Sequence, residues 1–198
     1  MEALLVVDVQ NDFCPGGALA VKDGDRVVAF INRIRQDFPL VVFTQDWHPR
    51  GHASFASNHR GKKPYDVIDL HGQPQTLWPD HCVQQSKGAE FHAKLDLRPS
   101  DPVFRKGTLQ EVDSYSGFLD NDRKHETGLR EFLERKGVDR IGLVGLATDY
   151  CVKFTALDAR RFGLQVKVLR QGCRAVNLDP KDEERAYDEM RAAGAEVE

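Results

Sequence analysis

Short apolar runs alternate with amphipathic stretches along the whole chain, and this alternation constrains the fold more than any other feature. The apolar, β-branched runs are the candidate strands, at residues 3–9, 40–45, 102–107, 140–146 and 164–170, with a short final candidate at 195–198. Between them lie the candidate helices, with apolar residues at helical spacing, in segments 25–36, 126–137, 149–162 and 178–194. Such alternation predicts an α/β fold of three layers, α/β/α, in which helices cover both faces of a doubly wound, mostly parallel sheet.

Two of the candidate helices carry specific boundary signals. Asp179 and Pro180 precede a turn rich in acidic residues, which predicts a helix with Asp179 as its cap and Pro180 at the first helical position. Gly137 is expected to end the segment 126–137 as its C-terminal cap.

The length and charge of the chain limit the classes of protein it can belong to. With 198 residues, no internal repeat and no linker, we expect a single domain over 1–198. A net charge of −3 and scattered basic residues argue against nucleic-acid binding. No apolar segment approaches the roughly 20 residues that span a membrane, and the N-terminus lacks the basic region of a signal peptide. Four cysteines without CxxC spacing favour reduced thiols and a cytoplasmic location. The oligomeric state is left open, a homo-oligomer included.

Residues 46–100 interrupt the alternation with a long stretch that has little periodicity. The stretch is rich in histidine, proline and glycine and contains both tryptophans of the chain. A long segment of this kind inside a compact domain is typically functional or disordered, and the tryptophans and histidines argue against disorder. We therefore expect a loop region that binds a ligand.

Reactive side chains follow four of the predicted strands. Asp8 lies near the end of the first strand, Asp46 and His48 follow the second, Lys106 closes the third, and Cys151 follows the fourth. Ligands of parallel α/β sheets bind outside the carboxyl ends of the strands, so these side chains are expected to meet at one edge.

Cys151 has two interpretations at this stage. A free cysteine is often a small hydrophobic residue in the core. A cysteine at a helix N-terminus, beside the cation of Lys106 and a carboxylate such as Asp8, is instead typical of a nucleophile. The other cysteines are better explained by packing or loop positions, at 14, 82 and 173.

A group of metal-ligand residue types lies in the long loop region. Asp46, His48 and His52 fall within seven residues, and His81 follows later. Carboxylate and imidazole ligands suit zinc, manganese or iron, and the residue types do not choose among them. Hydrogen-bonded loop histidines are the alternative. The remaining histidines are expected at the surface, at 59, 71, 92 and 125.

Aromatic residues are interleaved with these polar groups. Phe13, Trp78 and Tyr115 suit a pocket that stacks a planar aromatic ligand. Core packing is the alternative, and for Trp47 it is the better interpretation.

Several sequence blocks together resemble the nicotinamidases of the isochorismatase-like cysteine hydrolase superfamily. The blocks run in family order and cover most of the chain: DVQNDFCPGGAL (8–19), QDWHPRGHASFA (45–56), WPDHCV (78–83), FRKGT (104–108), DSYSGF (113–118) and GLATDYCVKFTALDA (145–159). The metal segment and the SYSGF aromatic distinguish nicotinamidases within the superfamily. Gln171 departs from the acid that family members often carry, at a position outside catalysis.

The resemblance implies hydrolysis of nicotinamide to nicotinate and ammonia through a thioester, in NAD salvage, with pyrazinamide also accepted. It implies that Cys151 is the nucleophile, Asp8 the general base and Lys106 the group that stabilises the thiolate. One divalent metal ion, zinc before manganese or iron, would be held by Asp46, His48 and His81, with His52 as an optional ligand.

The resemblance also implies how the substrate and the oxyanion are bound. The backbone amides of Ala147 and Cys151 match the oxyanion hole, beside an expected cis peptide between Leu146 and Ala147. The matching pocket residues are Phe13, Leu19, Trp78, Tyr115 and Ala147. The implied strand order is 3-2-1-4-5-6.

Three rival functions are weighed against this one. Another hydrolase of the superfamily, acting on isochorismate, N-carbamoyl or ureido compounds, would lack the set of Asp46, His48 and His81. A nucleotide-binding oxidoreductase would need a GxGxxG motif after the first strand, which is absent. A non-catalytic metal-binding protein of the same fold would not need the cysteine, acid and lysine.

Overall fold

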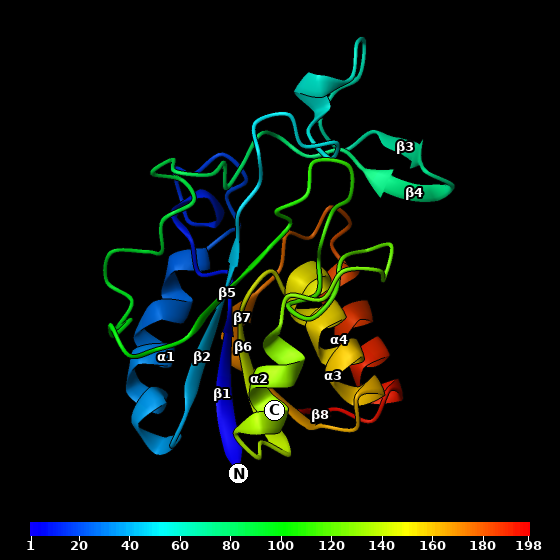
Figure 1. Ribbon diagram of the computed structural model, residues 1–198. Helices are drawn as coiled ribbons and strands as arrows, with labels where there is room; N and C mark the ends of the chain where they lie inside the picture. Colours follow the sequence, from blue (N-terminus) through cyan, green and yellow to red (C-terminus); the bar gives the residue numbers. More distant parts are fainter.

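The computed structural model describes residues 1–198 and is built on one parallel sheet of six strands (Figure 1). The strands are β1 (Glu2–Val7), β2 (Val41–Asp46), β5 (Val103–Lys106), β6 (Arg140–Leu146), β7 (Gln165–Arg174) and β8 (Glu196–Val197). Their order across the sheet is β5-β2-β1-β6-β7-β8, and every neighbouring pair is parallel. Counted along the chain, this is the order 3-2-1-4-5-6, and the expected strand order is confirmed.

Helices cover both faces of the sheet, as the three-layer expectation requires. The α-helices are α1 (Val27–Ile34), α2 (Leu129–Arg135), α3 (Lys153–Arg161) and α4 (Asp182–Ala192). Helix α1 covers one face, and the other three cover the opposite face (Figure 1). Short 3₁₀ turns connect the elements at Asn11–Phe13, Gly24–Arg26, Arg35–Asp37 and Ala56–Asn58, and one π-helical turn occupies Thr148–Val152.

Strand β1 explains why the sheet is buried on both faces. Residues 3–7 are all fully buried, and successive side chains of a strand point to opposite faces. Leu4 and Val6 pack in the core cluster that includes α1. Leu5 and Val7 pack in the cluster formed with α2, α3 and α4. The unbroken apolar run of β1 thus supplies two separate cores, which is typical of parallel strands.

Several element boundaries differ from those that the sequence predicts. Helix α4 begins at Asp182, because Asp179 accepts a hydrogen bond from the Lys181 amide (2.9 Å) and shapes a turn that also contains Pro180. Strand β7 continues to Arg174, four residues past the expected end. Gly137 adopts φ +66° just beyond α2, in agreement with its expected role as a cap.

The long loop region is ordered by contacts with itself and with the sheet edge. It contains an unpredicted hairpin of β3 (Val67–Leu70) and β4 (Gln73–Thr76), which forms a separate two-stranded sheet. The backbones of Ser54 and Ala56 bond to Trp78 on both sides, with N–O distances of 2.8 and 2.9 Å. None of the helices has the length and apolar character of a membrane-spanning segment.

Candidate active site

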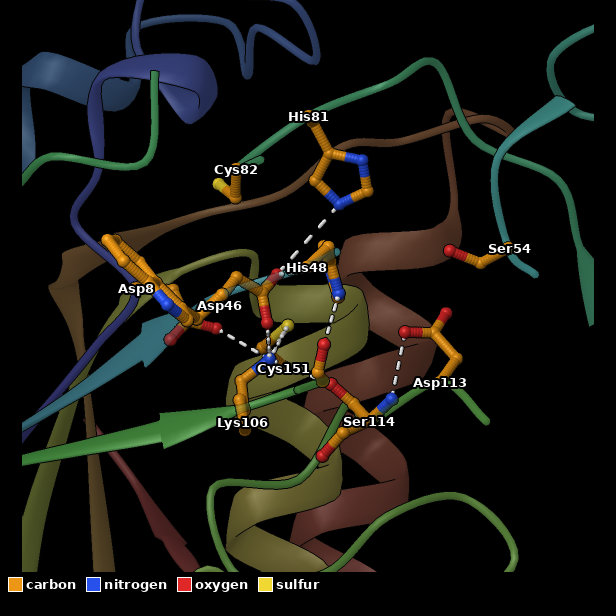
Figure 2. A network of polar contacts seen from close by, with 12 residues as sticks. Asp8, Asp46, His48, Ser54, His81, Cys82, Lys106, Asp113, Ser114 and Cys151 are labelled. Carbon is orange, nitrogen blue, oxygen red and sulfur yellow. Dashed lines mark hydrogen bonds and ion pairs between the residues drawn. The ribbon is translucent and has the colours of Figure 1, made fainter. Parts of the chain in front are cut away.

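Four side chains from four sheet strands and their following turns meet at the carboxyl edge of the sheet (Figure 2). Asp8 directly follows β1, Asp46 ends β2, Lys106 ends β5, and Cys151 lies in the π-helical turn after β6. All four are buried. The residues that the sequence places at neighbouring strand ends are therefore in direct contact.

Lys106 is the centre of this cluster. Its Nζ lies 3.0 Å from Asp8 Oδ2 and 3.3 Å from Cys151 Sγ, and it forms a short ion pair with Asp46 Oδ1. The carbonyl of Ser114 accepts a further bond at 2.8 Å. Four acceptors thus surround an ammonium that has three hydrogens. The two carboxylates raise the pKa of Lys106 well above its ordinary value against the effect of burial, so the group stays charged.

Asp8 has one carboxylate oxygen that accepts a hydrogen bond and one that does not. Thr44 Oγ1 donates to its Oδ1 (2.7 Å), while Oδ2 has no hydrogen-bond donor, although it faces the Lys106 charge. Burial raises the pKa of Asp8 to about 6, and Lys106 opposes the rise. The residue also has φ +49°, a left-handed conformation that is uncommon outside glycine and is found at functional sites.

The surroundings of Cys151 favour its protonated form. Burial raises the pKa of the thiol well above its ordinary value, and Asp8 and Asp46 add to the rise, while Lys106 lowers it. From the sequence alone, Lys106 and the helix start favour a thiolate. Burial of the thiol and its two neighbouring carboxylates, which the sequence does not show, favour the protonated form. The thiol must therefore be deprotonated during a reaction rather than before it.

The backbone before Cys151 contains the expected cis peptide, and an oxyanion role for Ala147 and Cys151 stays a prediction. The peptide bond between Leu146 and Ala147 is cis, as expected. Ala147 and Cys151 both line the same cavity. Gly145, with φ +125°, lies against β1 so closely that a Cβ would fall 2.0 Å from the Val7 carbonyl oxygen, so only glycine fits there.

Asp46, His48 and His81 form a candidate metal centre beside the cysteine. Their ligand atoms lie within 4.8 Å of one another, with His48 Nε2 3.5 Å and His81 Nε2 3.9 Å from Asp46 Oδ2. The Nδ1 of His48 bonds to the Gly107 carbonyl (2.9 Å), and that of His81 bonds to the Pro79 carbonyl (2.8 Å). These bonds orient both Nε2 atoms toward Asp46, as outer contacts of metal-binding histidines do.

The charges of Asp46 and His81 also fit a divalent cation, whereas Asp46 raises the pKa of His48 against the effect of burial, so that ring would release its proton on binding one. Burial and the neighbouring His48 lower the pKa of His81 to about 4, which leaves its ring neutral. Burial favours a protonated Asp46, but Lys106 and His48 lower its pKa far below the ordinary range. A carboxylate oxygen and imidazole nitrogens of this kind match zinc and similar ions.

His52 lies outside the group of Asp46, His48 and His81 and packs against the ring of His48. Its Nδ1 bonds to Ser54 Oγ (2.7 Å) and its Nε2 to the Val112 carbonyl (3.2 Å), so both ring nitrogens have protein partners. Its ring packs 4.2 Å from that of His48. His48, His52 and Asp113 form a second group of potential ligands within 4.8 Å. A ligand role for His52 stays a prediction.

A small cavity of about 30 Å³ opens onto Cys151 and the candidate metal centre. The side chains expected to bind substrate all line it: Phe13, Leu19, Trp78, Tyr115 and Ala147. Trp47 lies elsewhere, with the Arg105 guanidinium stacked 3.9 Å from its ring.

Several residues of the site escaped the sequence argument. Gln10 forms two 2.8 Å bonds with the backbone of Asp46, and Thr44 bonds Asp8. Gly107 is the partner of His48, while Asp113 and Tyr150 line the cavity. All five lie in or beside the recognised blocks or strands, but their contacts join segments far apart in the chain, which spacing alone does not reveal.

The other residues that the sequence argument weighed lie outside the cluster. His71 and His125 are exposed, His92 is half-buried, and the half-buried His59 bonds to the Ala53 carbonyl (2.7 Å). The remaining three cysteines are buried and free, at positions 14, 82 and 173.

The fold and the site together define a class: doubly wound α/β proteins with a cysteine, carboxylate and lysine cluster beside a candidate metal centre. The model of the isochorismatase domain matches residues 2–198. The chain belongs to the isochorismatase family.

Individual relatives narrow the comparison. The nicotinamidase of Escherichia coli is 51% identical over 197 residues, which are 98% of this chain and 92% of that one. The structure of the yeast nicotinamidase bound to the inhibitor nicotinaldehyde has a TM-score of 0.96 and 33% identity, covering 100% and 99% of the two chains. The pyrazinamidase of Pyrococcus horikoshii in complex with zinc has a TM-score of 0.81 and 38% identity, covering 100% and 98%.

Proposed function

We propose that this protein is a nicotinamidase, which hydrolyses nicotinamide to nicotinate and ammonia within one domain over residues 1–198. The observation that carries the proposal is the contact of Lys106 with both Asp8 and Cys151 at the floor of an aromatic cavity. A buried acid, cation and thiol in contact supply a base and a nucleophile, the requirements of covalent amide hydrolysis. The similarity to the nicotinamidase of Escherichia coli supports the choice of amide.

The first half of the reaction forms a thioester. Asp8 Oδ2 accepts the proton of Cys151 as the sulfur attacks the carboxamide carbon. Lys106, 3.3 Å from the sulfur, stabilises the negative charge as it develops. The amides of Ala147 and Cys151 donate to the oxyanion, where one donor is worth about 10²–10³ in rate. Asp8 then returns the proton to the leaving nitrogen, and ammonia is released.

The second half hydrolyses the thioester. Asp8 accepts a proton from water, whose oxygen attacks the acyl carbon. The carbon–sulfur bond breaks, nicotinate forms, and the proton held by Asp8 restores the thiol of Cys151. One carboxylate thus serves as base and acid in both halves, a role for which a pKa of about 6 is well placed.

A divalent ion, zinc in the first instance, would be held by Asp46, His48 and His81. When bound, it would supply a Lewis acid that holds the ring nitrogen of the substrate and so fixes the orientation of the amide. The zinc complex of the Pyrococcus horikoshii relative supports this choice of metal. Pyrazinamide carries a ring nitrogen in the same relation to its amide, and we expect it to be a second substrate.

The test is hydrolysis of a panel of nicotinamide, pyrazinamide, an N-carbamoyl compound and isochorismate, measured as ammonia release for the first three and as pyruvate release for isochorismate, which contains no nitrogen. Each is assayed before chelation, after chelation and after zinc is restored. We expect ammonia release only from nicotinamide and pyrazinamide. This activity should be lost on chelation and recovered when zinc is restored. Activity on the N-carbamoyl compound or isochorismate in place of nicotinamide would overturn the proposal.

A further inference from the structure

Two cavities meet at one thin wall beside the active site. Cys151 lines the inner cavity, and residues of the β3–β4 hairpin line a larger outer cavity of about 550 Å³. Asp113 lines both cavities, and Gln75 lines the outer one. Gln75 Nε2 lies 2.9 Å from Asp113 Oδ2 and 3.2 Å from the hydroxyl of Tyr115, which lines the inner cavity. A single layer of two side chains therefore separates the two spaces.

A second route between the site and solvent would serve the proposed reaction. Ammonia leaves, and water enters, while the acyl group is still bonded to Cys151 and its ring still fills the aromatic cavity. A route through the outer cavity would leave the ring in place while both molecules pass. This advantage rests on the proposed function, because it follows from the thioester.

The linings of the two cavities suit different kinds of molecule. Eight of the eleven residues around the inner cavity are hydrophobic, which suits a heteroaromatic ring. Only three of the fourteen around the outer cavity are hydrophobic, and Glu111, Asp122 and Lys124 lie among them as charged groups. A polar lining suits water and ammonia, and carboxylates attract ammonium.

Gln75 is held in a way that permits movement. Its amide nitrogen has two hydrogens but three acceptors in reach, since the Thr76 carbonyl lies 2.8 Å away in addition to Asp113 and Tyr115. One of the three acceptors is therefore always without a hydrogen from Gln75, so the amide has an alternative partner when one bond breaks. The residue lies on a two-stranded hairpin that pairs with no other strand, and such hairpins are only marginally stable alone.

We propose that Gln75 and Asp113 form a gate through which ammonia leaves the acyl-enzyme and the hydrolytic water enters. Ammonia and water pass between the gate and solvent through the outer cavity, and the aromatic ring does not. One ammonia exits and one water enters per turnover, and the proton transfers remain those of Asp8.

The test measures which nucleophiles reach the thioester. N-Methylhydroxylamine, larger than water, is added during nicotinamide turnover, and the ratio of hydroxamate to nicotinate is determined. We expect Gln75→Ala to raise this ratio about tenfold, which corresponds to 1.36 kcal/mol of barrier. The ratio is fixed within each turnover, so it is independent of the fraction of folded protein, and Gln75→Ser serves as a second widening variant.

Blocking the outer cavity with a large side chain tests whether the nucleophile enters through it. Gln73→Trp places bulk in the outer cavity, and Val67→Trp places the same bulk on the same hairpin outside that cavity. We expect Gln73→Trp to abolish the gain of Gln75→Ala, and Val67→Trp to leave it intact. A gain that survives Gln73→Trp, or no gain in either widening variant, would overturn the gate. Absence of any hydroxamate and nicotinate from the unmodified protein would instead contradict the proposed function.

Discussion

At the scale of single residues, the site is a balance of buried charges around Lys106. Two carboxylates, a thiol and a carbonyl share one ammonium, and none of them has ready access to water. Transferring the thiol proton to Asp8 neutralises one carboxylate and creates a thiolate, so the net charge around Lys106 is unchanged. This conservation of charge allows a buried site to move a proton at low cost.

The raised pKa of Asp8 predicts the pH dependence of activity. Asp8 must be ionised to accept a proton, so kcat/KM is expected to fall as the pH drops through about 6. The stability effect has the opposite sign. A carboxyl whose pKa is raised on folding from 3.8 to about 6 stabilises the fold below pH 3.8 and loses that contribution as the pH rises through 6. Rate profiles and urea denaturation across this range measure both effects, and Asp8→Asn should remove both. An acid limb retained by Asp8→Asn would contradict the assignment.

Removing the central cation is expected to destabilise the protein. Lys106→Met keeps the length of the side chain but leaves Asp8 and Asp46 buried without their counter-charge, at a cost of about 3–5 kcal/mol. Urea denaturation measures the loss. The double variant Lys106→Met with Asp8→Asn also removes one of the two unpaired carboxylates, so it should recover part of the lost stability. Equal stability of Lys106→Met and the unmodified protein would contradict a stabilising role for the Lys106 charge.

At the scale of elements, strand ends and the turns after them do most of the positioning. Gly107, directly after β5, has φ +60° and contacts the ring of His48 so closely that a Cβ would lie 2.3 Å from its Cε1. Its carbonyl also holds His48 Nδ1. Gln10 likewise bonds the backbone at the end of β2, where Asp46 lies. Backbone and amide contacts from one strand end thus orient the side chains of the next.

Gly107→Ala is expected to weaken metal binding. The added methyl group displaces His48, and loss of an outer contact to a metal ligand lowers affinity about 10–100-fold. Gly61→Ala is the matched control, because Gly61 also has positive φ but no atom within 4 Å of its Cβ position. Competition with a chromophoric zinc chelator measures both variants. Equal zinc affinities for the two would contradict the role of Gly107.

At the scale of the whole molecule, the parallel sheet and the convergence of Asp8, Asp46, Lys106 and Cys151 were accessible from the residue pattern, whereas the strand order was implied by the resemblance to the family. Apolar periodicity identifies the strands, and the carboxyl edge of a parallel sheet gathers the residues that follow them. The β3–β4 hairpin was not predicted, since its strands expose most of their residues and lack an apolar alternation. The state of the Cys151 thiol also depends on burial by distant segments, which residue spacing does not report.

The central claim is that Cys151 carries the acyl group, and rapid-quench mass spectrometry of the protein during nicotinamide turnover tests it most directly. We predict a nicotinoyl thioester on the peptide that contains Cys151. We also predict neither adduct nor ammonia release from Cys151→Ala, with circular dichroism as the check on its fold. Near-normal ammonia release from Cys151→Ala, or an adduct on Cys14, Cys82 or Cys173 instead, would contradict the account.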